Sequence, residues 1–173
     1  NFKNMTNIGK STRDLLSQRS YIFRPLINSC QESEDGTIKW LINLQDDSLI
    51  ETVFIPQGKR GTVCLSSQVG CTLNCSFCHT GTQKLVRNLK SYEIVSQLLI
   101  VMDHLNEWPS GKLNRKITNI VMMGMGEPLL NYENVKKALL TIMSPEGISI
   151  SKRRITMSTS GIVPEIERCG GDL

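Results

Sequence analysis

The sequence after Gly61 alternates between short apolar segments and longer amphipathic ones, and this order limits the possible folds more than any other feature. Segment 117–123 is mostly apolar, as is typical of a strand buried on both faces of a parallel sheet. Strands are expected over 62–67, 117–123 and 154–159, and helices after caps at Ser91 and Asn131 and from Pro164. Because strands and helices alternate, we predict an α/β fold of about three βα units with right-handed crossovers.

A β-hairpin is predicted ahead of this region. Apolar and polar side chains alternate over 38–44, and a second strand over 49–55 ends at Pro56. Residues 11–24 favour a helix that stops before the following proline, whereas the polar stretch 28–36 indicates a linker. The expected parts are a helical segment and linker at 1–35, a hairpin at 36–60 and an α/β region at 61–173.

Three cysteines, Cys71, Cys75 and Cys78, lie close together soon after the first of the α/β strands. A cubane 4Fe–4S cluster prefers one thiolate on each iron, so three thiolates would leave one iron free to bind a small molecule. A structural zinc site needs four closed ligands, and a zinc loop with Cys64 as the fourth ligand is the alternative. His79 is interpreted as a loop residue rather than a ligand.

The six cysteines do not indicate a disulfide framework, because three of them are too close together and no secretory signal is seen. We expect a reducing, cytoplasmic environment and metal ligation instead. No run of about 18 apolar residues occurs, so no membrane partner is expected. The net charge of +4 permits a phosphate-rich partner without demonstrating one.

Two further segments are expected at the same edge of the sheet as the cysteines, because the carboxyl ends of parallel strands gather catalytic groups. Segment 124–128 follows the second strand, and its glycines let the backbone approach a ligand closely. Within it, Glu127 offers a carboxylate for the ammonium group of an amino-acid moiety. Ser158 lies near the end of the third strand. A plain βα turn and a buried strand serine are the respective alternatives.

The cysteine loop, with aromatic Phe77 before its last cysteine, resembles the cluster loop of the radical S-adenosylmethionine (SAM) enzymes. Four ordered blocks narrow this resemblance: Glu51–Pro56, Cys64–Cys71, Asn119–Leu129 and Lys152–Gly161. Together they resemble the RlmN family, which comprises radical SAM methyltransferases acting on C2 of adenine in 23S rRNA and tRNA. The resemblance implies a partial radical-SAM (βα) barrel, preceded by the hairpin and the N-terminal helical segment, with 61–173 as its N-terminal half.

The resemblance also implies one 4Fe–4S cluster and S-adenosyl-L-methionine as cofactors. The implied cluster ligands are Cys71, Cys75 and Cys78, and the implied SAM-binding residues are Gly126, Glu127 and Ser158. In the family, a 5′-deoxyadenosyl radical takes hydrogen from a cysteine-bound methyl group, and the carbon radical adds to C2. Cys64 matches the cysteine that then releases the product by forming a disulfide, and Glu51 matches the general base that removes the C2 proton. Without the resemblance, Cys64 would be an inward strand thiol and Glu51 an exposed hairpin carboxylate.

The family's methyl-carrying cysteine is expected beyond Leu173, since Cys169 does not stand in its motif. Cys169 and Cys30 are interpreted as packing thiols. We therefore expect a piece of a longer chain that cannot complete methyl transfer alone. The expected partners are 23S rRNA at the peptidyl-transferase centre, tRNA at the anticodon loop and a low-potential, flavodoxin-like electron donor, and the expected state is a monomer. A Cfr-type enzyme acting on C8 of the same adenine and a non-catalytic, zinc-stabilised RNA-binding module are the alternatives.

Basic residues near the cysteine loop are expected to contact RNA phosphates. They are Lys59, Arg60, Lys84, Arg87 and Lys90, with 152–154 further along. A solvated surface is the alternative. Replacing Arg87 and Lys90 with Ala is predicted to weaken RNA binding and its salt dependence.

Overall fold

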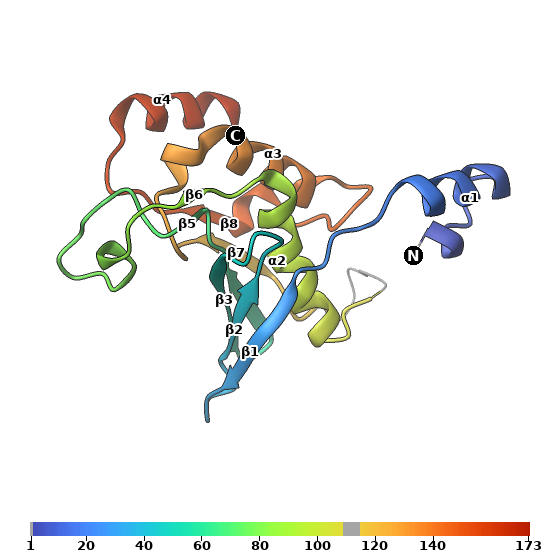
Figure 1. The fold of residues 1–173 in the computed structure, drawn as a ribbon, viewed down its shortest axis with the longest axis horizontal. Helices are drawn as coiled ribbons and strands as arrows, with labels where there is room; N and C mark the ends of the chain where they lie inside the picture. Colours follow the sequence, from blue (N-terminus) through green and yellow to red (C-terminus); the bar gives the residue numbers. More distant parts are fainter. Residues whose placement is uncertain (1, 109–114) are drawn as a thin grey trace.

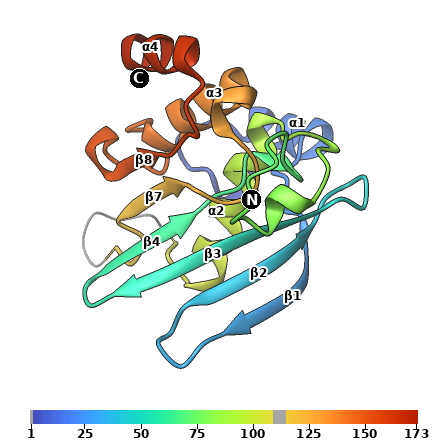
Figure 2. The same ribbon diagram turned by 90° about the vertical axis from the view of Figure 1, so that its left-hand side faces the viewer.

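The computed structural model describes residues 2–108 and 115–173 and shows one six-stranded sheet with helices against one of its faces. The strands of this sheet, in spatial order, are β1 (Leu26–Glu32), β2 (Ile38–Asn43), β3 (Leu49–Gln57), β4 (Arg60–Cys64), β7 (Asn119–Met122) and β8 (Ile155–Met157). β1 to β4 are antiparallel neighbours, whereas β4, β7 and β8 run parallel (Figure 2). A small second sheet pairs β5 (Gln68–Val69) with β6 (Arg87–Asn88).

The helices are α1 (Lys10–Arg19), α2 (Ser91–His104), α3 (Tyr132–Met143) and α4 (Val163–Asp172). Short 3₁₀ helices span Phe2–Asn4, Thr80–Thr82, Pro128–Asn131 and Lys152–Arg154. α2 connects β4 to β7 and α3 connects β7 to β8, and the two helices pack against each other. α1 and the cysteine loop lie at opposite ends of the molecule's longest axis (Figure 1). Within the described residues, every helix is too short or too polar to traverse a bilayer.

The hydrophobic core lies between the sheet and the helices α2 and α3. On the sheet side it contains Trp40, Ile50 and Val63, which are buried completely, and on the helix side it contains Leu98 and Val135. The alternation of apolar side chains in the strands places these residues on one face, because successive strand residues point to opposite sides. The helices contribute apolar stripes at helical spacing, so burial of both surfaces fixes how the βα units pack.

The opposite face of the parallel strands carries a different row of side chains. Val53, Cys64, Val121 and Thr156 are consecutive partners across β3, β4, β7 and β8, so their side chains share that face. Three of the four are half-buried and Thr156 is exposed. The sheet is not closed, since β1 and β8 form its edges. An open sheet with a helix-covered face and a less covered face is what a partial barrel requires.

The predicted α/β order and hairpin are confirmed, whereas the N-terminal expectations need correction. The stretch 28–36 was expected to be a linker, but residues 28–32 belong to β1 and pair with β2. All seven β1 side chains are exposed, so this edge strand lacks the alternation of apolar and polar residues from which a strand is predicted. α1 ends at Arg19 rather than extending to residue 24, because the backbone of Ser20 is extended. The helix also buries no side chain, so no packing stabilises further turns. The divisions at 35/36 and 60/61 stay predictions.

Candidate functional site

The cysteine loop is tied together at its base. It leaves β5 and returns through β6, whose residues pair in register with it. Gly70 has a φ of 75°, and a Cβ placed there would lie 2.2 Å from the carbonyl oxygen of Lys84, so only glycine permits this crossing. The next residue, Cys71, forms an isolated parallel β-bridge with Lys84 and donates its N–H to the carbonyl of Gln83 at 3.3 Å. The loop therefore starts and ends in one place.

All three loop cysteines are half-buried free thiols. The N–H of Leu73 donates to the Cys71 sulfur at 3.4 Å, which is the kind of contact that tunes iron–sulfur ligands. The N–H of Cys78 donates to the carbonyl of Cys75 at 3.1 Å, forming a turn that places these two thiols on one short segment. Phe77 between them is 91% exposed, so it contributes no core packing.

Three thiols on one short loop are the donor set for a metal site here. Within residues 2–108 and 115–173, no three Cys, His, Asp or Glu side chains converge as ligands of one ion. A zinc loop completed by Cys64 would bring four thiolates to one ion, with zinc–sulfur bonds of about 2.3 Å, and stays the alternative. In a cubane, by contrast, each thiolate binds a different iron, so the sulfurs stand farther apart. The three half-buried thiols on one loop fit a cubane with one iron free of protein ligands.

The turn after β7 packs tightly against the segment that follows β4. A Cβ at Gly126, where φ is 92°, would lie 2.4 Å from the Gln68 Cβ, and one at Gly124 would lie 2.7 Å from the Ser66 hydroxyl oxygen. The sequence predicted that these glycines let a ligand approach. The structure shows that the protein's own backbone and side chains occupy the space that each Cβ would take. The glycines are therefore required for the site to assemble at all.

Glu127 is buried, and its carboxylate joins the turns that follow β7 and β8. One oxygen accepts the N–H of Leu129 at 3.0 Å, and the other accepts the N–H and the hydroxyl of Ser160 at 2.9 and 3.1 Å. A carboxylate offers about four acceptor positions, so one remains for a further donor. Ser158 is exposed and directly follows β8, at the same edge. The expected roles of Glu127 and Ser158 in SAM binding stay predictions.

Gln68 is a connecting residue that the sequence reasoning missed. Its side chain is buried; its carbonyl oxygen accepts the N–H of Glu127 at 3.0 Å, and its amide donates to Asn88 at 2.7 Å. It thereby links the Gly-Glu turn to the base of the cysteine loop. Asn131, expected as a helix cap, instead donates to the carbonyls of Ser67 and Leu89 at 2.7 and 2.8 Å. The sequence did contain one indication of this buried polar cluster, namely the three consecutive polar residues 66–68 at the end of an apolar strand.

A second buried connection joins Ser66 to the hairpin. Gln97 of α2 accepts the N–H of Ser66 at 2.8 Å and donates to its carbonyl at 3.0 Å, while also accepting the hydroxyl of Thr52 at 2.8 Å. The Ser66 hydroxyl donates to the carbonyl of Glu51 at 2.6 Å and accepts the N–H of Met125 at 2.9 Å. Backbone groups from β3, from the segment after β4 and from the β7 turn are therefore held in one network.

Glu51 and Cys64 lie on the same, less covered face of the sheet. Cys64 pairs directly with Val53, and Glu51 is two residues before Val53 on β3. Burial raises the pKa of the Cys64 thiol, and a hydrogen bond from the Met123 N–H partly offsets that rise. The Glu51 carboxylate is 3.1 Å from the Lys39 ammonium, and both side chains are 44% exposed. The structure thus brings these two predicted residues together on one face.

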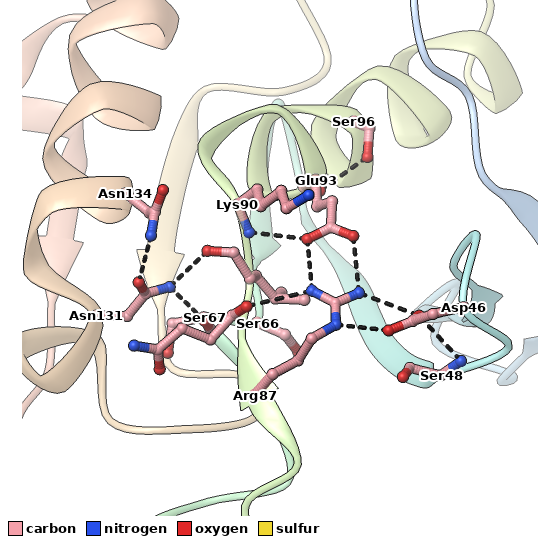
Figure 3. A network of polar contacts seen from close by, with 12 residues as sticks. Asp46, Ser48, Ser66, Ser67, Arg87, Lys90, Glu93, Ser96, Asn131 and Asn134 are labelled. Carbon is pink, nitrogen blue, oxygen red and sulfur yellow. Dashed lines mark hydrogen bonds and ion pairs between the residues drawn. The ribbon is translucent and has the colours of Figure 1, made fainter.

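Arg87 lies in a polar network and not on a free basic surface (Figure 3). Its guanidinium donates to both Glu93 oxygens at 2.8 and 2.9 Å and to both Asp46 oxygens at 2.6 and 3.1 Å. These carboxylates raise the pKa of Arg87, and Arg87 holds the pKa of Asp46 well below its usual range. Two carboxylates already pair with Arg87, so it is less available to RNA phosphates than its sequence neighbourhood suggested, and its expected RNA contact stays a prediction. The network fastens the end of the cysteine loop to α2 and to the hairpin turn.

The outlying cysteines differ from each other. Cys169 is half-buried and lines a small pocket with Leu139 and Met157, in agreement with a packing thiol, and burial raises its pKa. Cys30 is exposed on β1, so the interpretation of Cys30 as a packing thiol is wrong. Its edge strand has no layer of side chains above it to pack against.

Known proteins are similar to this chain over nearly its whole length. The radical SAM superfamily model matches residues 65–169, which include the cysteine loop and the turns after β7 and β8. Two proteins named dual-specificity RNA methyltransferase RlmN are similar over 99% of this chain: the one from Erythrobacter litoralis is 51% identical, and the one from Rhizorhabdus wittichii is 55% identical. The chain spans 45% and 43% of those two proteins, respectively.

A solved structure has the same fold. The crystal structure of a radical SAM methyltransferase from Sphaerobacter thermophilus aligns with a TM-score of 0.85 and 40% identity, covering 98% of this chain and 48% of that one. These matches confirm the resemblance inferred from the motifs. Because the superfamily model covers more than half of the sequence, the chain belongs to the radical SAM superfamily.

Proposed function

We propose that this chain is part of a radical SAM RNA methyltransferase that adds a methyl group to C2 of adenine in 23S rRNA and tRNA. The observation that carries the proposal is the common edge of the sheet. The cysteine loop, the Gly-Glu turn and Ser158 follow the carboxyl ends of β4, β7 and β8, which run parallel. The names of the similar proteins support RNA as the substrate class.

In this proposal, the loop thiolates hold the cofactor and the two turns hold SAM. When bound, a 4Fe–4S cluster with one thiolate-free iron supplies the electron for reductive cleavage of SAM. Cys71, Cys75 and Cys78 provide the thiolates, and the Leu73 N–H stabilises negative charge on the Cys71 sulfur. Glu127 accepts the ammonium of SAM at its remaining acceptor position, while its bonds to Ser160 fix its orientation. Gly126 and Ser158 complete the SAM-binding edge.

The less covered face of the sheet then presents the groups that act on the base. Glu51 takes the proton from adenine C2 as general base, and Lys39 orients its carboxylate. Burial raises the pKa of Cys64, so the side chain is a protonated thiol. The thiol must lose its proton before the sulfur can form a disulfide. The Ser66 hydrogen bond to the Glu51 carbonyl holds the general base in a fixed relation to the Gly-Glu turn. A low-potential electron donor completes the set of partners.

Anaerobic reconstitution with iron and sulfide tests the cofactor assignment. We expect wild-type chain and the Cys30→Ser control to bind about four irons each, and the EPR spectrum of the reduced cluster to change when SAM is added. Cys30 is a suitable control because it is an exposed thiol outside the loop. Cys75→Ser is expected to lose most of the iron. Full iron content in Cys75→Ser, or a wild-type spectrum that SAM leaves unchanged, would refute the assignment.

A further inference from the structure

A basic groove lies at the edge of the sheet opposite the cysteine loop. It has a volume of about 800 Å³ and is located where β4 and β7 begin and where β8 is entered. The β3–β4 turn that forms part of it is at the far end of β4 from the cysteine loop (Figure 2). Its charged lining residues are all cationic: Lys59, Arg60, Arg115, Lys116 and Arg154.

These groove residues correct one sequence expectation. Lys59 and Arg60 were expected near the cysteine loop, and the 152–154 segment further along the chain. In the structure, Lys59 immediately precedes β4 and Arg60 is its first residue. Residues 152–154 form the 3₁₀ helix that precedes β8. Because β4 and β8 are parallel to β7, both groups lie at the amino edge. Residues distant in sequence therefore gather on one surface, away from the reactive centre.

Three of the five cations are available to a ligand. Arg115 donates to the carbonyl of Ser149 at 3.1 Å and lies 3.7 Å from the Glu107 carboxylate, and Lys116 donates to the carbonyl of Leu105 at 2.9 Å. The other three are exposed, and within the described part of the chain their side chains form no hydrogen bond or ion pair: Lys59, Arg60 and Arg154. Among the described residues, none of those that line the groove is acidic, so no lining carboxylate neutralises these cations.

The floor beneath these cations is closely packed and hydrogen-bonded. A Cβ at Gly61 would lie 2.3 Å from the Phe54 ring, so the turn and the ring are in close contact. The Gly61 N–H donates to the Thr118 hydroxyl at 3.3 Å, and that hydroxyl donates to the Gly61 carbonyl at 3.2 Å. Phe54 is buried beneath the turn. The cations thus extend from a fixed base, which reduces the entropy lost when they bind a ligand.

We propose that this groove binds the phosphate backbone of the RNA substrate, away from the nucleotide that reacts. The cations of the groove indicate a polyanion, and the choice of RNA as that polyanion rests on the proposed function. Lys152 and Arg153 are exposed and belong to the same 3₁₀ helix as Arg154, so two further cations lie next to it in the chain. The five residues of β4 separate the two edges by about 16 Å, a distance that a folded RNA spans. Phosphate contacts of this kind set the register of an RNA while base contacts at the reactive edge specify it.

Salt-dependent RNA binding tests the groove. The groove variant combines Lys59→Ala, Arg60→Ala and Arg154→Ala. The matched control combines Lys10→Ala, Arg19→Ala and Lys137→Ala, which removes the same charge from exposed positions on α1 and α3. Binding of a fluorescein-labelled RNA hairpin is measured by anisotropy between about 50 and about 200 mM salt. Far-UV circular dichroism checks that both variants fold.

The groove variant is expected to show a smaller salt dependence. Because it lacks three cations that pair with phosphates, the slope of log affinity against log salt shrinks by about 2, so the affinity lost over that salt range falls by about 20-fold. The control keeps the wild-type slope. Equal slopes in the two variants would overturn the inference. The inference would also be overturned if the groove variant lost binding to poly-glutamate but kept the wild-type salt dependence of RNA binding. That result would indicate an acidic protein as the partner. Iron content and the SAM-dependent EPR change report separately on the proposed function, since the groove contributes no cluster or SAM ligand.

Discussion

Replacing Arg87 with Met removes the centre of the polar network in Figure 3 and should destabilise the fold substantially. Glu93 is only 2% exposed at its side chain, so without Arg87 it would keep one bond, from the Lys90 N–H at 2.8 Å. Removing one partner of a buried pair costs about 3 to 5 kcal/mol, whereas a half-exposed pair such as Arg87–Asp46 contributes about 0.2 to 1 kcal/mol. Because Arg87 itself is 28% exposed, we take the lower end and expect a loss of about 3 kcal/mol.

Two control variants separate the halves of the network. Asp46→Asn removes only the half-exposed ion pair and should cost about 0.5 kcal/mol. The double variant Arg87→Met with Glu93→Gln leaves no buried charge without a partner, so it should be more stable than Arg87→Met alone. Urea denaturation followed by circular dichroism measures the free energy of unfolding of each variant. A loss below about 1 kcal/mol in Arg87→Met would refute the view that the buried pair is essential.

The same network predicts a pH dependence. Arg87 lowers the pKa of Asp46 in the folded state, so the ionised carboxylate favours folding. That stabilisation is fully present above the ordinary Asp pKa of about 4 and is lost as the pH falls toward the lowered value. Between neutral pH and about pH 3, wild type should therefore lose stability relative to Asp46→Asn. Parallel stability curves for the two proteins would contradict this reasoning.

Two further predictions concern the site itself. Gly126→Ala should destabilise the chain by at least about 2 kcal/mol more than Gly161→Ala, because both glycines have positive φ but only a Cβ at Gly126 meets another side chain, at 2.4 Å from Gln68; equal melting temperatures would show that the close packing is relaxed at little cost. Alkylation of Cys64 by iodoacetamide, followed by peptide mass spectrometry, should reach half its maximal rate above the ordinary thiol pKa of about 8.5, because burial raises the Cys64 pKa and only the thiolate reacts. A midpoint at or below that ordinary value would contradict the burial seen on β4.

Periodic burial made much of the fold predictable. The alternation at Ile38, Trp40 and Ile42 identified β2 because its other residues face away from the core. The apolar run containing Ile120 and Met122 identified β7, although only these two of its four residues are fully buried and the other two are half-buried on the less covered face. β1 escaped notice because an exposed edge strand is held by backbone hydrogen bonds alone, and these leave no trace in side-chain pattern.

The reactive edge was predictable in outline, and its internal supports were not. The cysteine spacing and the Gly-Glu turn are local patterns, so the sequence shows them directly. Gln68 and Gln97 are buried polar residues whose partners come from other elements, and nothing local distinguishes them from surface glutamines. Arg87 looked like a free cation because Asp46, 41 residues away, approaches it only in the folded chain. Long-range pairing of charges is a tertiary property, so composition near a motif is a poor guide to which charges stay available.

The two outer strands of the open sheet also affect how the chain behaves among its own copies. β8 has only three residues and follows directly on three consecutive cations, Lys152–Arg154. Two copies of this piece that joined through β8 would bring like charges together, and a three-residue strand gives few hydrogen bonds in return. At the other border, an irregularity between Ile27 and Ser29 interrupts the ladder of β1. A kink in an edge strand is one device by which natural sheets resist edge-to-edge aggregation.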